Sequence, residues 1–225
     1  MNIELARFNM IEQQIRPWNL MDDSVLELLA VVKREDFVPK AQTGLAFADL
    51  EVPLLGSSDE ALGLGQCMLE PRLEARLLQD LAVQPTDTVL EIGTGSGYMA
   101  ALLSKKALRV LSLEIVPELV AMAQENLVKA DIHNVEVRQG DGAQMTAADG
   151  SFDVIALSGS VAEVPPALLK LLKIGGRLGA VVGDEPVMRA TVVTKVSDTE
   201  FRTVQEWDTH APRLRNFPQP SRFKF

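Results

Sequence analysis

Cysteine and histidine are scarce in this chain of 225 residues. Cys67 is its only cysteine, and His133 and His210 are its only histidines. One cysteine cannot form an intrachain disulfide, and these three residues are too few for a multi-cysteine or histidine-rich zinc site. We therefore expect no metal site. Cys67 is interpreted as a buried structural cysteine, with a reactive thiol as the alternative.

Long apolar runs and an excess of positive charge are also missing. The longest uncharged stretch runs from Ile92 to Ser104 and holds three glycines, whereas a membrane-spanning helix needs about 20 apolar residues. Glu4 and Arg7 interrupt the N-terminus, so no secretory signal is expected. The net charge of −9 disfavours binding to nucleic-acid backbones. These features predict a cytoplasmic protein that binds neither nucleic acid nor membrane.

The N-terminal third shows helical periodicity and then an irregular segment. Pro17 ends a first helical stretch, whose apolar residues are Leu5, Phe8, Ile11 and Ile15. Ser24 and Glu27 have the spacing of a capping box, which predicts a second helix that Pro39 stops. Its inward residues are expected to be Val25, Leu28, Leu29 and Val32. Residues 41–71 then lose the pattern and predict a long loop, up to a helix that begins near Leu73.

From residue 87 onward, strand-like and helix-like segments alternate. The predicted strands are Thr88–Ile92, Val110–Glu114, Val135–Arg138, Phe152–Leu157 and Arg177–Val182. The predicted helices run to Leu103, from Pro117 to Ala130, and from about Glu163 to Leu172, the last capped by Gly175 and Gly176. Thr191–Lys195 and Phe201–Trp207 predict a terminal β-hairpin. The expected fold is α/β, with a doubly wound, mainly parallel sheet.

The strongest motif is a glycine-rich turn between the first of these strands and its helix. Gly93, Gly95 and Gly97 follow the strand directly, and glycine lets a backbone turn sharply and approach a ligand closely. The turn therefore predicts a ligand beyond the carboxyl end of the strand, where doubly wound sheets bind. A merely tight strand-to-helix turn is the alternative.

Two acidic residues follow the next two strands. Glu114 ends the second strand and is suited to accept hydrogen bonds from the ribose hydroxyls of an adenosine. Asp141 and Gly142 follow the third strand and either meet an adenine ring or form a plain β-turn. Together with the glycine turn, these residues describe an adenosine site. The glycine spacing is G-x-G-x-G, which differs from the dinucleotide fingerprint G-x-G-x-x-G.

The motifs together resemble those of the protein-L-isoaspartate O-methyltransferases, a family of class I S-adenosylmethionine-dependent methyltransferases. The resemblance runs from about Met10 to Val182. The matching segments are Arg34–Pro39, Ala46–Asp49, Leu90–Tyr98, Val135–Gly142 and Gly175–Leu178. It implies a Rossmann-like sheet of seven strands whose last strand is antiparallel. It also implies a helical and loop extension at residues 1–71 that covers the site of a methyltransferase domain at residues 72–225.

The resemblance further implies the cofactor and its contacts. The cofactor is S-adenosylmethionine, and the product formed from it is S-adenosylhomocysteine. The implied contacts are Glu91, Gly93, Thr94, Gly95, Ser96, Gly97, Glu114, Ile115, Asp141 and Gly142. The implied reaction is methyl esterification of the carboxylate of isoaspartyl residues in peptides or proteins.

The sequence departs from the family pattern at the reaction centre. The family carries Gln-Thr-Ile-Ser-x-Pro before its first sheet strand, whereas here Leu69 occupies the serine position between Gln66 and Pro71. Leucine cannot form a hydrogen bond with a carboxylate. The catalytic residues are therefore left open, with Asp49 and Gln66 as candidates to compensate. An insertion at about 57–62 also falls in the expected substrate loop.

These departures leave three functions to weigh. The first is an isoaspartyl methyltransferase, which needs no general base because its acceptor is already an anion at neutral pH. The second is a methyltransferase of the same fold with a different small-molecule or protein acceptor. The third is a catalytically silent scaffold that only binds the cofactor. The natural acceptor and the oligomeric state do not follow from the sequence.

The last residues of the chain are basic. His210 is followed by Arg213, Arg215, Arg222 and Lys224. We interpret this segment as a solvated tail, with folding over the site or binding of an acidic partner as alternatives. His133 is interpreted as a turn residue before the third strand.

Overall fold

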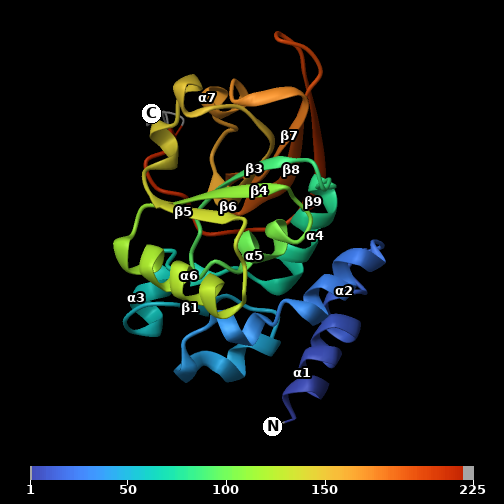
Figure 1. The fold of residues 1–225 in the computed structure, drawn as a ribbon, viewed down its shortest axis with the longest axis vertical. Coiled ribbons are helices and arrows are strands. Elements are labelled where there is room, and N and C mark those ends of the chain that lie inside the picture. The colour runs from blue at the N-terminus through green and yellow to red at the C-terminus, as the bar shows by residue number, and fades with distance from the viewer. Residues whose placement is uncertain (1, 220–225) are drawn as a thin grey trace.

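Seven strands form one sheet at the centre of the computed structural model, which describes residues 2–219 (Figure 1). Their order across the sheet is β5-β4-β3-β6-β7-β8-β9. The strands are β3 (Thr88–Ile92), β4 (Arg109–Glu114), β5 (Val135–Gln139), β6 (Phe152–Val161), β7 (Leu172–Asp184), β8 (Val187–Lys195) and β9 (Phe201–Asp208). From β3 the chain continues to β4 and β5 on one side, and it then crosses over to form β6 on the other side of β3. This is the switch point at which doubly wound sheets bind ligands.

The strand directions agree with a mainly parallel sheet and correct one detail. Strands β3 to β7 are parallel to one another, and β8 pairs antiparallel with β7 and with β9. The antiparallel C-terminal hairpin is therefore confirmed. The strand that opposes the others is β8, and the last strand, β9, runs in the same direction as the parallel five. The resemblance had placed the reversal at the last strand.

Alternation along the central strands divides the core between the two faces of the sheet. On β3, Val89 belongs to one apolar cluster and Leu90 to the other. On β6, Val154 and Ile155 alternate in the same way. Successive side chains of a strand point to opposite faces, so each strand contributes to both clusters. Both faces are thus buried, which explains the nearly continuous apolar runs of these strands.

The helices are distributed unequally over the two faces. Helices α4 (Pro71–Leu81), α5 (Tyr98–Ser104) and α6 (Pro117–Lys129) contribute to the Val89 cluster, together with the N-terminal segment. The opposite face is covered by α7 (Pro166–Leu169) and by irregular chain (Figure 1).

The helix predicted at about 163–172 is wrong in extent. Helix α7 has only four residues, and the chain joins β7 at Leu172. Proline is favoured at the first position of a helix, so α7 begins at Pro166, and the start of β7 at Leu172 leaves it little length. Gly175 and Gly176 lie within β7 and cap no helix. A Cβ at Gly176 would lie 3.0 Å from the Asp153 carbonyl oxygen, so the glycine permits close approach to β6.

The N-terminal segment is helical, as expected, but its details differ. It comprises α1 (Ile3–Asn9), a π-helix at Met10–Ile15, α2 (Asp23–Val31) and 3₁₀ helices at Arg34–Phe37 and Lys40–Phe47. Ile11 and Ile15 are buried, whereas Leu5 and Phe8 are exposed. Ser24 is not the cap of α2, because the Asp22 side chain accepts the Ser24 backbone N–H. A carboxylate two residues earlier thus takes the capping position.

The segment predicted as a long loop contains short elements of its own. Helix α3 (Ser58–Gly63) coincides with the insertion at 57–62, and β1 (Val52–Pro53) pairs with β2 (Cys67–Met68). Among the described residues, no helix is long and apolar enough to cross a membrane.

Candidate active site

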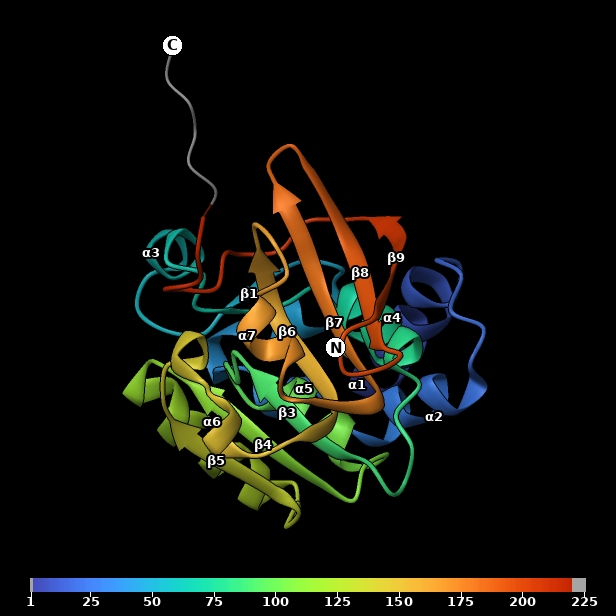
Figure 2. The same ribbon diagram turned by 90° about the horizontal axis from the view of Figure 1, so that it is seen from above.

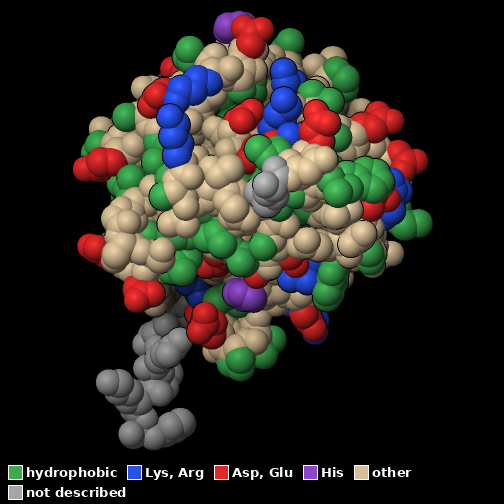
Figure 3. Space-filling model, turned by 90° about the horizontal axis from the view of Figure 1, so that it is seen from below, with side chains coloured by type: hydrophobic (Ala, Val, Ile, Leu, Met, Phe, Trp, Pro, Cys, Tyr) green, Lys and Arg blue, Asp and Glu red, His purple; other side chains and the backbone are tan. Residues whose placement is uncertain are grey.

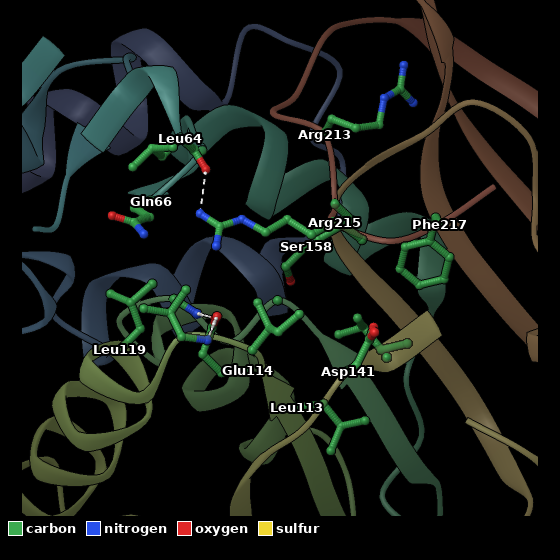
Figure 4. Close-up of a pocket in the computed structure, with 18 of the residues that line it drawn as sticks. Leu64, Gln66, Leu113, Glu114, Leu119, Asp141, Ser158, Arg213, Arg215 and Phe217 are labelled. Carbon is green, nitrogen blue, oxygen red and sulfur yellow. Dashed lines mark hydrogen bonds between the residues drawn. The ribbon is translucent and has the colours of Figure 1, made fainter. Parts of the chain in front are cut away.

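A pocket opens at the carboxyl ends of β3, β4, β5 and β6 (Figure 4). Several residues predicted from the sequence line it together, although they come from three strand-end turns and, for Gln66, from the segment before β2. These are Gln66, Gly93, Gly95, Glu114, Ile115, Asp141 and Gly142. The parallel strands end at one edge of the sheet, and that arrangement brings these turns together.

The glycine turn joins β3 to α5 and adopts backbone conformations that only glycine takes easily. Gly93, Gly95 and Gly97 have φ of +96°, +55° and +89°. A Cβ at Gly93 would lie 3.0 Å from both the Ser158 carbonyl oxygen and the Leu214 side chain. Glycine is therefore required here by conformation and by space. Gly97 faces helix α6, where an added Cβ would lie 3.3 Å from the Ala123 Cβ. The glycine therefore allows the turn to pack closely against α6.

Glu114 fastens the glycine turn to the end of β4. Its Oε2 accepts the Gly95 N–H at 2.9 Å, and its Oε1 accepts the Val116 N–H at 3.0 Å. The side chain is buried but lines the pocket. A carboxylate has about four acceptor positions, so Glu114 keeps acceptor capacity for a ligand hydroxyl.

Asp141 is held in a similar way at the end of β5. Its Oδ1 accepts the Ala143 N–H and its Oδ2 accepts the Asn216 side-chain amide, both at 2.9 Å. Gly142, the next residue, packs directly on Ile92, because a Cβ there would lie only 2.3 Å from Ile92 Cγ2. The tight contact sets the depth of this wall of the pocket.

Glu91 lies beneath the pocket and is absent from its lining. Its side chain is fully buried in β3, where Oε2 accepts the Ser112 hydroxyl at 2.6 Å and Oε1 accepts the Ser158 hydroxyl at 2.8 Å. Burial raises the pKa of Glu91 to about 8, against the opposing effect of the two serines. Ser158 lines the pocket, so Glu91 reaches the site through that hydroxyl.

A second, smaller cavity lies behind the glycine turn. Thr94, Ser96 and Leu69 line it, together with Glu74 and Tyr98. The Leu69 side chain also belongs to a small apolar cluster with Leu73, Val181, Met188 and Ala211. Leu69, at the position that carries serine in the family pattern, thus packs against an apolar cluster and also borders a cavity with polar residues.

A buried ion pair supports the segment that contains Leu69. The Arg34 guanidinium contacts the Glu74 carboxylate and donates to the Leu69 carbonyl oxygen at 2.6 Å. Burial raises the pKa of Glu74 to about 7, and the attraction of Arg34 opposes this rise. The Arg34 guanidinium carbon lies over the Tyr98 ring, 5.4 Å from the ring centroid, and the Tyr98 hydroxyl is buried without a hydrogen-bond partner among the described residues. No sequence motif predicted this polar network as a whole, because Arg34 and Tyr98 lie in two separate matching segments and Glu74 lies in neither.

The two candidates for compensating Leu69 take different positions. Gln66 lines the main pocket (Figure 4). Asp49 is outside the lining of both cavities and lies 3.4 Å from the Arg72 guanidinium. Burial raises the pKa of Asp49, with Arg72 acting in the opposite direction.

The remaining cysteine and histidine residues show no arrangement for metal binding. Cys67 is buried, and burial together with Glu51 raises the pKa of its thiol, which disfavours the reactive thiolate. His133 is exposed and contacts Asp131 in the turn before β5. Among residues 2–219, no cluster of three or more histidine, cysteine or acidic side chains could hold a metal ion.

The largest difference from expectation concerns the basic tail. After β9 the chain crosses the ends of the strands towards α3 (Figure 2). Ser160 N–H donates to the Pro212 carbonyl at 2.7 Å, and Leu214 N–H donates to the Ser160 carbonyl at 2.9 Å. Arg213, Leu214, Arg215 and Phe217 all line the pocket. The interpretation as a solvated tail is wrong for this part, and the alternative of folding over the site is correct. Arg222 and Lys224 lie outside the described residues.

Comparison with known proteins identifies the family of this pocket. The family model for protein-L-isoaspartate(D-aspartate) O-methyltransferase matches residues 6–210. The chain belongs to this family. The methyltransferases of the family use S-adenosylmethionine as the methyl donor.

Relatives agree with the family over nearly the whole chain. A protein-L-isoaspartate O-methyltransferase of Koribacter versatilis is 37% identical over 212 residues, which cover 94% of this chain and 92% of the relative. One of Methanoculleus marisnigri is 38% identical over 177 residues, covering 79% and 77%. A Plasmodium falciparum structure of this description, in complex with S-adenosyl-L-homocysteine, matches the fold with a TM-score of 0.78 at 20% identity, covering 93% of this chain and 98% of that one.

Proposed function

We propose that this enzyme transfers the methyl group of S-adenosylmethionine to the carboxylate of isoaspartyl residues in peptides or proteins. The observation that carries the proposal is the convergence of the glycine turn, Glu114 and Asp141 in one pocket of a chain of this family. The cofactor contacts that the resemblance implied are part of the proposal, with Glu91 acting through Ser158 and Gly97 through packing.

The residues of the pocket fit this cofactor by their hydrogen-bonding capacity. Gly93 and Gly95 hold the turn in positive-φ conformations, so that its backbone borders the pocket directly. Glu114 and Asp141 offer carboxylate oxygens to ribose hydroxyls and to the adenine amino group. When bound, the cofactor supplies a sulfonium that is already an activated methyl donor.

The chain needs no general base for this reaction. An isoaspartyl carboxylate has an ordinary pKa near 4 and is an anion at neutral pH. What the protein supplies is orientation, with the attacking oxygen, the methyl carbon and the sulfur in line. Leu69 is compatible with such a mechanism, because no proton has to be removed at its position.

Transfer of a labelled methyl group to a synthetic isoaspartyl peptide tests the proposal. The same peptide with a normal aspartyl bond is the control, and S-adenosylhomocysteine binding is measured by calorimetry in the same preparation. We expect label in the isoaspartyl peptide alone. Cofactor binding without transfer to either peptide contradicts the proposed acceptor.

One observation favours a second candidate function. Leu69 lies in an apolar cluster, and the inserted helix α3 lies close to the pocket entrance, where Leu64 lines it. These features suit a methyltransferase with a less polar acceptor. Label in metabolites or proteins of a cell extract, with none in the isoaspartyl peptide, supports this candidate. Label in no fraction, despite cofactor binding, supports a silent scaffold.

A further inference from the structure

The segment at residues 212–217, which we call the strap, crosses the pocket and is held at both ends. Two backbone hydrogen bonds join its beginning to Ser160. Near its other end, the Asn216 amide donates to Asp141, and Phe217 is buried in the core of the α7 face. Leu214, between these anchors, packs where a Cβ of Gly93 or Gly159 would lie. The backbone of Arg215 is therefore fixed over the pocket.

The two arginines of the strap differ in their partners. Arg213 donates to the Gly183 carbonyl and to Asp184, both at 2.7 Å, and it points away from the pocket centre (Figure 4). Arg215 reaches across the pocket and, within residues 2–219, donates only to the Leu64 carbonyl, at 3.3 Å. Among the described residues, no carboxylate oxygen lies within 4.0 Å of the Arg215 guanidinium. A guanidinium has five N–H donors, so most of those of Arg215 remain for a ligand or solvent.

Arg215 is an exposed cation in an acidic protein. The protein has a net charge of −9, and acidic and basic side chains are interspersed on the face shown in Figure 3. In the pocket itself, Glu114 and Asp141 each already accept two N–H groups. Arg215 lines the same pocket and has N–H groups to spare, so it is placed to receive an anion from outside the chain.

We propose that Arg215 binds a carboxylate of the reacting pair, an inference that rests on the proposed function. Two carboxylates meet in this pocket, that of the isoaspartyl acceptor and that of the cofactor's methionine moiety. A guanidinium matches a carboxylate with two parallel hydrogen bonds. Leu69 cannot donate a hydrogen bond to a carboxylate, so Arg215, in the C-terminal strap, supplies the donor that is missing at position 69.

The chemistry of transfer is consistent with this role. One carboxylate oxygen forms a bond to the methyl carbon as the bond from that carbon to sulfur breaks, and sulfur keeps the electron pair. No proton moves. An arginine paired with the acceptor carboxylate fixes the direction of its attacking oxygen, and it loses this ionic partner once the ester is formed. Product release is then favoured over substrate release.

The variant Arg215→Gln tests the proposal, with Arg215→Lys as the conservative variant. Arg202→Gln is the matched control, since Arg202 is exposed on β9 and its substitution changes the net charge equally. Calorimetry measures the Kd of S-adenosylhomocysteine, and steady-state kinetics measure KM and kcat for an isoaspartyl peptide. Thermal unfolding checks that the variants fold.

The two sources of the carboxylate give different results. If Arg215 binds the acceptor, Arg215→Gln raises the peptide KM by about tenfold and leaves the Kd of S-adenosylhomocysteine unchanged. Arg215→Lys then has a KM between those of the unsubstituted enzyme and of Arg215→Gln. If it binds the cofactor, the Kd rises by a similar factor. Values within twofold of Arg202→Gln for both quantities overturn the proposal. Absence of transfer by the unsubstituted enzyme instead overturns the proposed function, and this inference with it.

Discussion

At the scale of single residues, Glu91 links the site to the stability of the protein. Its carboxyl is buried between two serine hydroxyls, and its pKa is raised to about 8. In the unfolded chain the pKa of a glutamate is about 4.3. Between these values the folded protein binds more protons than the unfolded chain, so the free energy of unfolding falls as pH rises.

Glu91→Gln is expected to remove this contribution. The unsubstituted protein loses stability between about pH 4.5 and pH 8, whereas the variant keeps a flatter profile because its amide does not titrate. Urea unfolding at pH 5.5 and pH 8.5 measures the difference. Parallel pH profiles for the two proteins contradict the expectation.

Gly142 provides a test of the pocket wall. Gly142→Ala places a methyl group against the buried Ile92, and overpacking of this kind costs about 1–3 kcal/mol of stability. We expect a lower Tm and weaker binding of S-adenosylhomocysteine, because both residues line the pocket. The control is Gly44→Ala, where an added Cβ meets nothing within 4 Å.

At the scale of elements, helix α4 and the 3₁₀ helix at Arg34–Phe37 are joined by the Arg34–Glu74 pair. Removing one partner leaves the other charge buried and uncompensated, which costs about 3–5 kcal/mol. We therefore expect Glu74→Ala to lower the free energy of unfolding strongly, and the double variant Arg34→Met with Glu74→Met to be more stable than either single variant.

Chemical denaturation of the single and double variants measures this coupling. The exposed pair of Arg16 and Glu12, which lie four residues apart, is the control and is expected to contribute less than about 1 kcal/mol. If the double variant loses as much free energy of unfolding as the two single variants lose together, the pair is not coupled.

The existence of each strand in the sheet was predictable, but β6, β7 and β8 are longer than predicted and some helix limits differ, for physical reasons that the elements themselves show. A buried parallel strand such as Thr88–Ile92 consists mainly of apolar residues between turn residues, so its limits follow from the sequence. The extent of α7 depended on how far a helix continues past two prolines before β7 begins. Similarly, Asp22 and Ser24 both suit a capping position, and only the folded chain decides between them.

The site was predictable where its residues follow strands directly. Glu114 and Asp141 lie at strand ends, so the topology of the sheet brings them together. Arg34, Glu74 and the strap follow no such rule, because tertiary packing alone places them. The one signal for the strap was its basic composition, which predicts exposure as readily as it predicts a role in the pocket.

At the scale of the whole molecule, the N-terminal segment and the sheet share a core. Leu29, Phe37 and Tyr98 belong to one cluster, although they come from either side of the proposed boundary at residue 71. We propose that residues 1–71 and 72–225 form one folding unit. Calorimetry is expected to give a single transition whose calorimetric and van't Hoff enthalpies agree.

A truncated chain that begins at residue 72 provides the complementary test. Without the N-terminal segment, the outer surfaces of α4 and α5 lose their cover, and an exposed apolar face of that kind promotes aggregation. We expect this chain to be insoluble or molten. A separate transition for the first 71 residues in the intact protein contradicts the shared unit.

The position of the strap along the chain separates the fold from the site. All seven strands of the sheet precede residues 212–217, and the strap adds only Leu214 and Phe217 to the core of the α7 face. A chain that is cut after β9 therefore keeps nearly the whole core and lacks one wall of the pocket. Proteolysis or a premature stop at this point is expected to give a folded protein that has lost its ligand site.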